Sequence, residues 1–315
     1  MEVTTLNTAE AVQWFLHMAE LNIFPQAEYM LGSIHHNGYG GIDSKVQAAA
    51  WFRRSAEKNF ATAQLALGRM YATGVGMAKD VTEAAKWYRK AAEQGEAFAQ
   101  YCLGASYDAG AGVPKDSNEA LRWYRLAAKQ GQPESQYNVG RSYELGVGVA
   151  KDEAEAFQWY RKAAEQGLAE GRAKLGLFYS GGHGVRKNME EALKWYRLAA
   201  EQNNIDAQFN LGLMYYRGTG VGRDRAQAVK WFGKAADQGD MDAQQALGVI
   251  YANGFGAPKN PKEAMRFFRL AAEQGDARAH RDRGSLRRLR GGLRALGSRC
   301  RCCGRLCAAE ELYFS

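Results

Sequence analysis

Cysteine, proline and long apolar runs are scarce in this sequence. Only 5 of its 315 residues are proline and 5 are cysteine, which argues against a collagen-like or proline-rich linker protein. No stretch approaches the ~18 apolar residues that a membrane-spanning helix needs, and the first 30 residues show no secretory signal. With one cysteine in the first 280 residues, we expect a cytoplasmic protein. A periplasmic or secreted protein is the alternative, if a signal peptide has been removed.

The positive charge is concentrated at one end of the chain. The net charge is +8, and residues 281–315 hold nine arginines against three acidic residues, which leaves only +2 for the first 280 residues. Nucleic-acid binding needs a concentrated positive surface, so the main part of the chain does not favour it. The hydrophobic content of the whole sequence, 46%, and its charged content, 24%, are typical of a soluble folded protein.

Residues 281–315 differ in composition from the rest and are rich in Arg, Gly, Leu and Cys. Four cysteines crowd this tail, at a spacing that matches no usual zinc pattern: Cys300, Cys302, Cys303 and Cys307. We therefore expect a tail that is non-native or disordered. The alternatives that stay open are a native basic arm that binds nucleic acid or a membrane surface, and a metal site built on these four cysteines.

A period of 36 residues organises the chain. The spacing between successive tryptophans is 37 residues once and then 36 residues five times, and a glycine recurs every 36 residues from Gly32 to Gly248. Such a period indicates a repeat architecture. The seven tryptophans are Trp14, Trp51, Trp87, Trp123, Trp159, Trp195 and Trp231.

Each unit is expected to contain two helices. Asp80 and Glu83 form a predicted capping box, the helix that follows ends at Gly95, and a second helix begins near Ala97. Only Gly or Asn occupies the Gly95 position in the other units, as a left-handed helix cap requires. Gly104 lies inside the second helix, where glycine costs about 1 kcal/mol relative to alanine. We expect that a bulky side chain, the Trp of the paired helix, packs closely against it.

Stacked units of two antiparallel helices describe an all-α solenoid. The motifs Ala99–Gly104, Gly146–Val149 and Trp159–Gly167 resemble Sel-one-like repeats (SLR), a relative of the tetratricopeptide repeat, over about residues 24–280. The resemblance implies a right-handed superhelix of about seven helix-turn-helix repeats and a role as an adaptor or scaffold in bacterial complexes. The disulfide of each repeat in cysteine-rich members is not expected here, because the cysteines are missing.

Three segments follow from this organisation. Residues 1–26 contain Ala11, Trp14, Phe15 and Ala19, which predict a capping helix that resembles the second helix of a preceding unit, and a one-residue insertion explains the spacing of 37. Residues 27–280 form the predicted solenoid, and residues 281–315 form the tail.

Motifs for chemistry are weak. Ser55 and Lys58 form the only Ser-x-x-Lys in the chain, a pattern of penicillin-recognising enzymes, but the partner motifs of those enzymes are missing. The Gly-x-Gly pairs follow helices rather than strands, and the histidines form no metal-binding helix pair. We therefore predict no catalytic, cofactor-binding or metal-binding residues. A β-lactamase-like hydrolase is kept as an alternative function.

A partner is expected in the concave groove of the solenoid, lined by one helix of each repeat. The candidate residues lie three positions before and one position after the recurring glycine, and two more lie one turn further on. They include aromatic and Arg side chains, which commonly anchor interfaces. We therefore predict a scaffold that binds a protein or peptide, with no nucleic acid and no membrane insertion. The predicted groove residues are Tyr29, Leu65, Arg69, Tyr101, Tyr137, Arg141, Glu144, Phe209, Leu213 and Tyr216.

Overall fold

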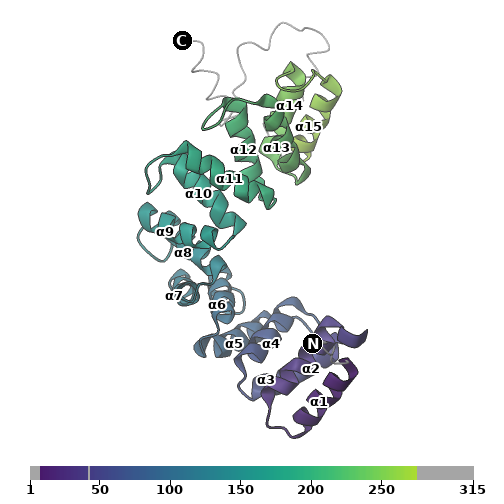
Figure 1. Cartoon of the computed structure of the whole chain (residues 1–315). Helices are drawn as coiled ribbons and strands as arrows, with labels where there is room; N and C mark the ends of the chain where they lie inside the picture. The colour runs from purple at the N-terminus through teal and green to yellow at the C-terminus, as the bar shows by residue number, and fades with distance from the viewer. Residues whose placement is uncertain (1–7, 42, 275–315) are drawn as a thin grey trace, which may run out of the picture. The chain divides into compact units, whose positions relative to one another are not determined.

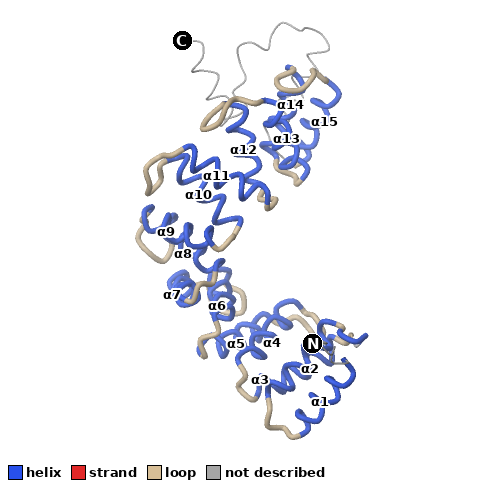
Figure 2. The backbone as a smooth tube through the Cα atoms, viewed as in Figure 1, coloured by secondary structure: helices blue, strands red, loops and turns tan. Residues whose placement is uncertain are grey.

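The computed structural model describes residues 8–41 and 43–274, and this part of the chain contains helices and no strands (Figures 1 and 2). This confirms the predicted all-α fold. The helices are α1 (Thr8–Glu20), α2 (Pro25–Asn37), the 3-10 helix η1 (Tyr39–Gly41), α3 (Lys45–Glu57), α4 (Ala61–Thr73), α5 (Val81–Glu93), α6 (Ala97–Ala109), α7 (Ser117–Lys129), α8 (Pro133–Leu145), α9 (Glu153–Glu165), α10 (Ala169–Gly181), α11 (Met189–Glu201), α12 (Ile205–Arg217), α13 (Arg225–Asp237), α14 (Met241–Asn253) and α15 (Pro261–Glu273).

After α1, the helices alternate between two types. We call the first helix of each repeat helix A (α2, α4, α6, α8, α10, α12 and α14) and the second helix B (the odd-numbered helices from α3 to α15). The chain divides into two compact units, Met1–Trp159 and Tyr160–Ser315, and the division falls within α9. In each unit, successive helices pack on one another, which confirms the predicted solenoid of helix pairs.

Helix B begins at a side-chain cap. The Asp80 carboxylate accepts hydrogen bonds from the backbone N–H groups of Thr82 and Glu83, at 2.9 and 3.0 Å, so the predicted cap is confirmed. The predicted reciprocal bond from Glu83 is wrong, because the backbone N–H of Asp80 donates to the carbonyl of Tyr71 instead and Glu83 pairs with Lys86. The start of helix B is thereby tied to the end of helix A.

Helix B ends in a left-handed residue. Gly95 has φ of 91°, and the equivalent Asn59 and Asn203 have φ of 65° and 63°. Asn and Gly are the residues that tolerate this conformation best, so the sequence-based prediction is confirmed at these positions. Gly275, the last member of this series, lies outside the described residues.

The recurring glycine of helix A is a notch for an aromatic ring of helix B. A Cβ added at Gly104 would lie 2.8 Å from Cδ1 of Tyr124 and 3.2 Å from the carbonyl oxygen of Ala120. The expectation that the tryptophan fills this space is wrong, because the ring belongs to the residue after Trp123. Tyr124 is 4% exposed, and its packing offsets the helix-propensity cost of the glycine.

A ladder of glutamine side chains connects neighbouring repeats. Gln100 donates to the carbonyl of Ala92 in the preceding repeat at 3.2 Å and accepts from Gln130 of its own repeat at 2.9 Å. Because Gln100 is 5% exposed, both bonds satisfy buried polar groups. The Gln–Gln bond recurs at Gln64/Gln94, Gln208/Gln238 and Gln244/Gln274, and Arg172 takes the place of the glutamine in α10.

The first repeat replaces the glutamine pair by an ion pair. Glu28 of α2 stands at the Gln64 position, and its Oε1 lies 2.9 Å from Nζ of Lys58 and 3.1 Å from Nη2 of Arg54. Lys58 stands at the Gln94 position. The Glu28 side chain is fully buried, and its ion pairs with these two cations offset the cost of removing the carboxylate from water.

Helix α1 packs at the N-terminal end of the first unit, next to α2 (Figure 1). Val12 and Ala19 of α1 are buried against Leu31 and Ile34 of α2. Asn22 has a positive φ of 58°, like Asn59, so the one-residue insertion lies at Ile23. The helix expected in residues 1–26 is present, whereas the predicted tail at 281–315 lies outside the described residues.

Candidate functional site: the exposed face of helix A

The predicted partner site lies on one face of the A helices. Positions 2, 5, 9 and 12 of each 13-residue helix are three or four residues apart and share a face. In the first unit we call this surface of α4, α6 and α8 the helix-A face, which carries Arg69, Phe98, Tyr101, Tyr137 and Arg141. These side chains are half-buried or exposed. They are therefore available for contact with a partner.

The predicted groove residues fall into three classes of exposure. Arg69 and Arg141 are exposed. A second class is half-buried and comprises Tyr29, Tyr101, Tyr137, Glu144 and Tyr216. A third class is buried and comprises Leu65, Phe209 and Leu213, at 9%, 3% and 7% exposure.

The placement of Leu65, Phe209 and Leu213 in an open groove is wrong. Leu65 belongs to a core cluster that includes Trp123, and Phe209 and Leu213 belong to the core of the second unit. Leu65 and Phe209 match the half-buried Tyr101 and Tyr137 in position, and Leu213 matches the exposed Arg69 and Arg141. All three nevertheless lie in core clusters that contain aromatic rings of B helices. Phe209 lies 5.6 Å from Phe232, between ring centres.

An aromatic and cationic cluster joins α4 to α6. The guanidinium of Arg69 lies 5.7 Å from the ring centre of Phe98, and the ring of Phe98 lies 5.5 Å from that of Tyr101. A cation over an aromatic face is attracted by the ring quadrupole, which orients Arg69 along the helix-A face. Sequence reasoning missed Phe98, although its place three residues before Tyr101 on the same helical face could have identified it.

An ion pair joins α6 to α8 on the same face. Arg141 Nη2 lies 2.6 Å from Oδ2 of Asp108. Both side chains are partly exposed, so the pair contributes little to stability. It does orient Arg141 beside Tyr137, one turn earlier in α8. Asp108 was also missed by the sequence analysis.

Two of the half-buried tyrosines have packing partners within their own units. Tyr29 lies 5.5 Å from Phe52 and 5.6 Å from Phe60, between ring centres. Tyr216 lies 6.5 Å from Phe232 and below the guanidinium of Arg225. Both therefore serve the packing of helix A on helix B as well as its surface.

Cys102 lies on α6, next to Tyr101 of the aromatic and cationic cluster. Burial raises the pKa of its thiol to about 12, and Arg69 opposes this only in part. The thiolate is the nucleophilic form of cysteine. Cys102 therefore has the properties of a packing residue rather than of a reactive thiol.

The histidine pair does not form a metal site within the described residues. Burial lowers the pKa of His35 and His36, and Lys45 and Arg69 lower that of His36 further. The residues that the structure describes contain no group of three or more His, Cys, Asp or Glu side chains that could hold a metal ion. The Nδ1 atoms of both histidines are buried, and the ring of His36 packs beside Phe52.

The Ser-x-x-Lys motif is not arranged for catalysis. Ser55 is fully buried, and its hydroxyl donates to the carbonyl of Pro25 at 2.6 Å. Lys58 pairs with Glu28. A nucleophile needs a base within hydrogen-bond reach and access to substrate, so this geometry argues against the hydrolase alternative.

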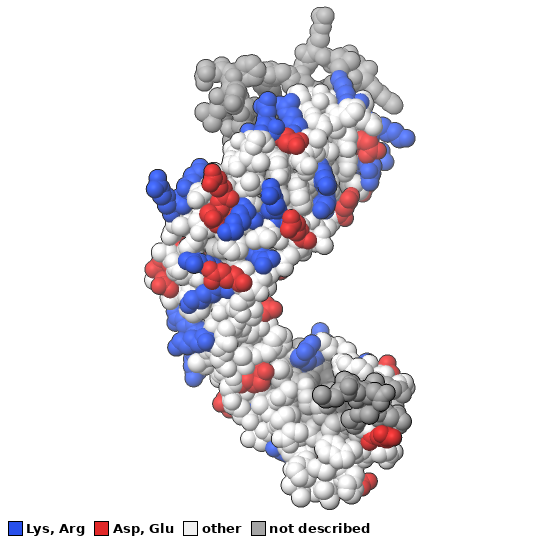
Figure 3. Space-filling view, in the orientation of Figure 1, with Lys and Arg blue, Asp and Glu red and all other residues white. Residues whose placement is uncertain are grey.

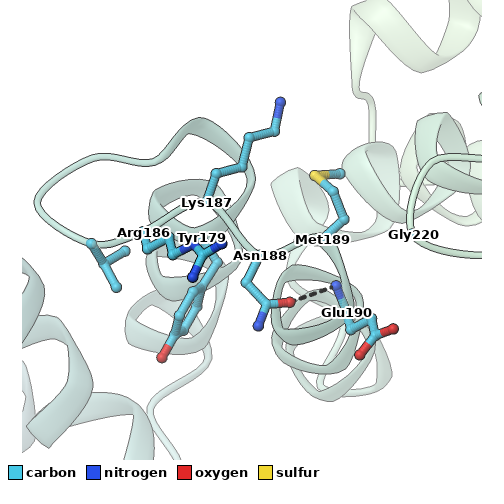
Figure 4. A pocket seen from close by; sticks show the side chains of 8 residues that line it. Tyr179, Arg186, Lys187, Asn188, Met189, Glu190 and Gly220 are labelled. Atoms are coloured by element: carbon cyan, nitrogen blue, oxygen red, sulfur yellow. Dashed lines mark hydrogen bonds between the residues drawn. The ribbon is translucent and has the colours of Figure 1, made fainter.

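A shallow hollow of the second unit lies at a repeat loop (Figure 4). Tyr179, Arg186, Lys187 and Met189 line a volume of about 670 Å³. The side chain of Asn188 already accepts from the backbone N–H groups of Glu190 and Glu191. These amides are therefore occupied and do not form an anion site.

Charge on the surface is mixed. In the view of Figure 3, basic and acidic side chains are interspersed over the helices, and each unit carries both signs. Among the described helices, none is both long enough and apolar enough to cross a bilayer.

Comparisons with known proteins agree with the repeat architecture. The Sel1 repeat model matches residues 25–60, 61–96, 97–132, 133–168, 169–204, 205–240 and 242–276. A search of curated proteins gave no match. These seven matches cover more than half of the chain and therefore identify its family.

Two crystal structures share both sequence and fold with this chain. A protective antigen present in uropathogenic Escherichia coli strains, which displays an SLR fold, is 37% identical with a TM-score of 0.81. That match covers 92% of this chain and 62% of the antigen, so this chain spans less than two thirds of that relative. A Sel1 repeat protein from Oxalobacter formigenes is 34% identical with a TM-score of 0.71, over 78% of this chain and 96% of that one. The chain belongs to the Sel1 repeat family, an all-helical, tetratricopeptide-like group of repeat proteins.

Proposed function

We propose that this chain is a non-catalytic scaffold that binds a helical or extended segment of a partner protein on its helix-A face. Sel1 repeat proteins are generally protein-interaction scaffolds. The observation that carries the finer proposal is the cluster of Arg69, Phe98 and Tyr101 across two repeats. Aromatic and Arg side chains are the usual energetic anchors of interfaces.

The chemistry of the face indicates the kind of segment that fits. Phe98, Tyr101 and Tyr137 offer half-buried rings, which suit apolar or aromatic side chains of a partner. Arg69 is exposed beside them and suits a carboxylate, because its guanidinium has donors in a planar fork. We therefore propose a segment that combines apolar anchors with at least one acidic residue.

The test is capture of a partner from lysate of the source cells, followed by titration of the purified partner. The wild-type chain should bind it, whereas Tyr101→Ser with Tyr137→Ser should lose about 2 kcal/mol or more of binding free energy. Because Tyr101 also packs near Tyr124, Arg69→Glu provides a second variant that alters only an exposed side chain.

The matched control is Lys86→Ser with Arg122→Ser, which changes exposed side chains on B helices. This control should bind like the wild type. Equal affinity of the Tyr101/Tyr137 variant, the Arg69→Glu variant and the control would contradict the placement of the site on the helix-A face.

A further inference from the structure

Within the described residues, the first unit begins with a helix of the B type, and no described helix A precedes it. Helix α1 has 13 residues, with Trp14 at position 7 and Phe15 at position 8. In α3 and in every later helix B, the same two positions hold the Trp or Phe and the ring that follows it. By sequence and by its packing on α2, α1 is therefore a helix B.

Each later helix B inserts its position-8 ring into the glycine notch of its own helix A. Added Cβ atoms at Gly32, Gly68 and Gly212 would lie 2.5–2.7 Å from the rings of Phe52, Tyr88 and Phe232. The position-8 rings are at most 6% exposed from α3 to α15. The contact is thus a repeated knob-in-notch interface that buries an aromatic ring almost completely.

Among the described helices, no glycine notch receives the same ring of α1. Phe15 is only half-buried, and Trp14 is 57% exposed, whereas the ring at the position of Trp14 is half-buried or buried in every later helix B. The two rings pack edge to face on each other, with centres 5.1 Å apart. Ala11 and Met18, at positions 4 and 11 of the same face, are also half-buried, although these positions are fully or almost fully buried in the later B helices.

Exposed apolar side chains gather around this edge. Leu21, Ile23 and Phe24 follow α1 directly, at 47%, 69% and 39% exposure. Contiguous exposed apolar surface of this kind marks an interaction site.

We infer that this edge, formed by Trp14, Phe15, Met18 and Leu21, docks an amphipathic helix of the helix-A type supplied by a partner protein. The seven internal copies of the interface define the chemistry of that helix. It carries a glycine opposite Phe15 and a tyrosine three residues later, as Gly248 and Tyr251 do in α14. Met18 replaces the Ala or Ser of the later B helices, and its flexible side chain can yield to the docked helix.

This surface is distinct from the helix-A face, so the inference does not depend on the proposed function. The two also differ in ligand. The helix-A face takes a segment with apolar and acidic side chains, whereas the α1 edge takes a helix whose glycine leaves room for a ring.

The probe for the test is a synthetic peptide of residues 240–254 with blocked ends, which contains α14, its Asp240 cap and the Gly248 notch. The readout is the indole N–H signal of Trp14 in the isotope-labelled full chain. An isolated helix of this length is marginal in water, so we expect weak, saturable binding with a dissociation constant of roughly 0.1–1 mM. The matched control peptide carries Gly248→Leu, which fills the notch.

The inference predicts that the Trp14 signal moves with the native peptide and not with the Gly248→Leu peptide. Trp14→Ser and Phe15→Ala should each weaken binding about tenfold, and Trp14→Ser should leave the thermal unfolding temperature unchanged because Trp14 is exposed. The inference would be overturned if the Trp14 signal did not move at peptide concentrations several times the expected dissociation constant. It would also be overturned if the signal moved equally with both peptides.

Two further outcomes would assign the edge to another occupant and would also overturn it. If the Trp14 signal shifts with protein concentration alone, a second copy of the chain covers the edge. If the peptide binds only after removal of residues 1–7, the chain's own N-terminal segment covers it.

Discussion

Arg89 in α5 donates a hydrogen bond to the hydroxyl of Tyr107 in α6 over 2.6 Å, and its guanidinium lies 5.8 Å from the centre of the same ring. The bond joins helix B of one repeat to helix A of the next, and we call it the Arg–Tyr clamp. The clamp recurs as Arg53–Tyr71, Arg125–Tyr143 and Arg197–Tyr215. In α13 the arginine position holds Gly233, so the junction to Tyr251 in α14 has no clamp.

Gly233→Arg should stabilise the protein. A Cβ added at Gly233 meets nothing within 4 Å, and replacing glycine inside a helix gains about 1 kcal/mol. The new arginine should add about 0.5–1 kcal/mol through the hydroxyl of Tyr251. Urea unfolding followed by circular dichroism would measure the gain. Gly233→Ala is the control for helix propensity, and a Gly233→Arg variant no more stable than Gly233→Ala would show that no clamp forms.

Gly104→Ala should lower the free energy of unfolding, whereas Gly233→Ala should raise it. The added methyl at position 104 would lie 2.8 Å from the ring of Tyr124, so the two helices must separate. We expect a loss of about 1–3 kcal/mol in the free energy of unfolding, despite the better helix propensity of alanine. Parallel urea titrations of the two variants compare the sites directly. Stabilisation at both positions would refute the tight notch.

Gln100→Leu should break one rung of the glutamine ladder. The substitution removes the side-chain donor to the carbonyl of Ala92 and the acceptor of one hydrogen bond from the Gln130 amide. Gln130 keeps its second bond, to the carbonyl of Gly95. We expect a loss of about 1–3 kcal/mol. Hydrogen exchange should report faster opening of α5 and α6. Gln130→Ala removes only the more exposed partner and should lower the free energy of unfolding by less. An equal loss in both variants would show that the buried bond from Gln100 to Ala92 adds no stability.

The ion pair of the first repeat should be convertible to the glutamine form. Lys58→Gln alone leaves the buried Glu28 with only Arg54, and we expect a loss of about 1–3 kcal/mol, because one cation remains. Adding Glu28→Gln should recover most of this loss, since the pair then matches Gln64 and Gln94. Thermal unfolding of the two single variants and the double variant gives the coupling. Additive effects would show that the two side chains act independently.

Cys102 should react slowly with thiol reagents in the folded chain. Burial raises the pKa of its thiol to about 12 from a usual value of 9.0. The folded state therefore holds this proton more tightly than the unfolded state, so the stability that Cys102 contributes is complete below about pH 9 and falls as the pH rises above it. Peptide mapping after alkylation at pH 8 would follow this cysteine alone. Labelling as fast as in urea would contradict the burial.

The sequence was enough to predict the repeat, the helix pairs and their ends, because each depends on local chemistry. A left-handed position admits Asn59 or Gly95 and little else, and Asp80 identifies a helix start by itself. The ring that fills the Gly104 notch was assigned to the wrong residue. Trp123 and Tyr124 are adjacent in sequence, and only the rotation of helix B about its axis decides which of them faces the glycine.

The candidate surface was predictable only in part. Tyr101 and Arg69 lie on the helix-A face as the register predicts, because positions 5 and 9 share a helical face. Leu65 and Phe209 occupy position 5 as well, yet they are buried. Their burial depends on side chains of neighbouring helices in the same core clusters, and the position of a residue in the 36-residue period does not specify those contacts.

The Glu28–Lys58 pair bears on how the chain finds its correct pairing during folding. Repeats this similar, with Trp87–Gly95 and Trp159–Gly167 identical in sequence, offer each helix A several B helices of nearly equal fit. Glu28 distinguishes one of them. If α2 paired with α5 or with another B helix that ends in glutamine, a carboxylate would be buried without Lys58. The ion pair thus favours the pairing of α2 with α3 over its pairing with any other helix B. It distinguishes this repeat from the others, whose helices are otherwise similar enough to exchange partners.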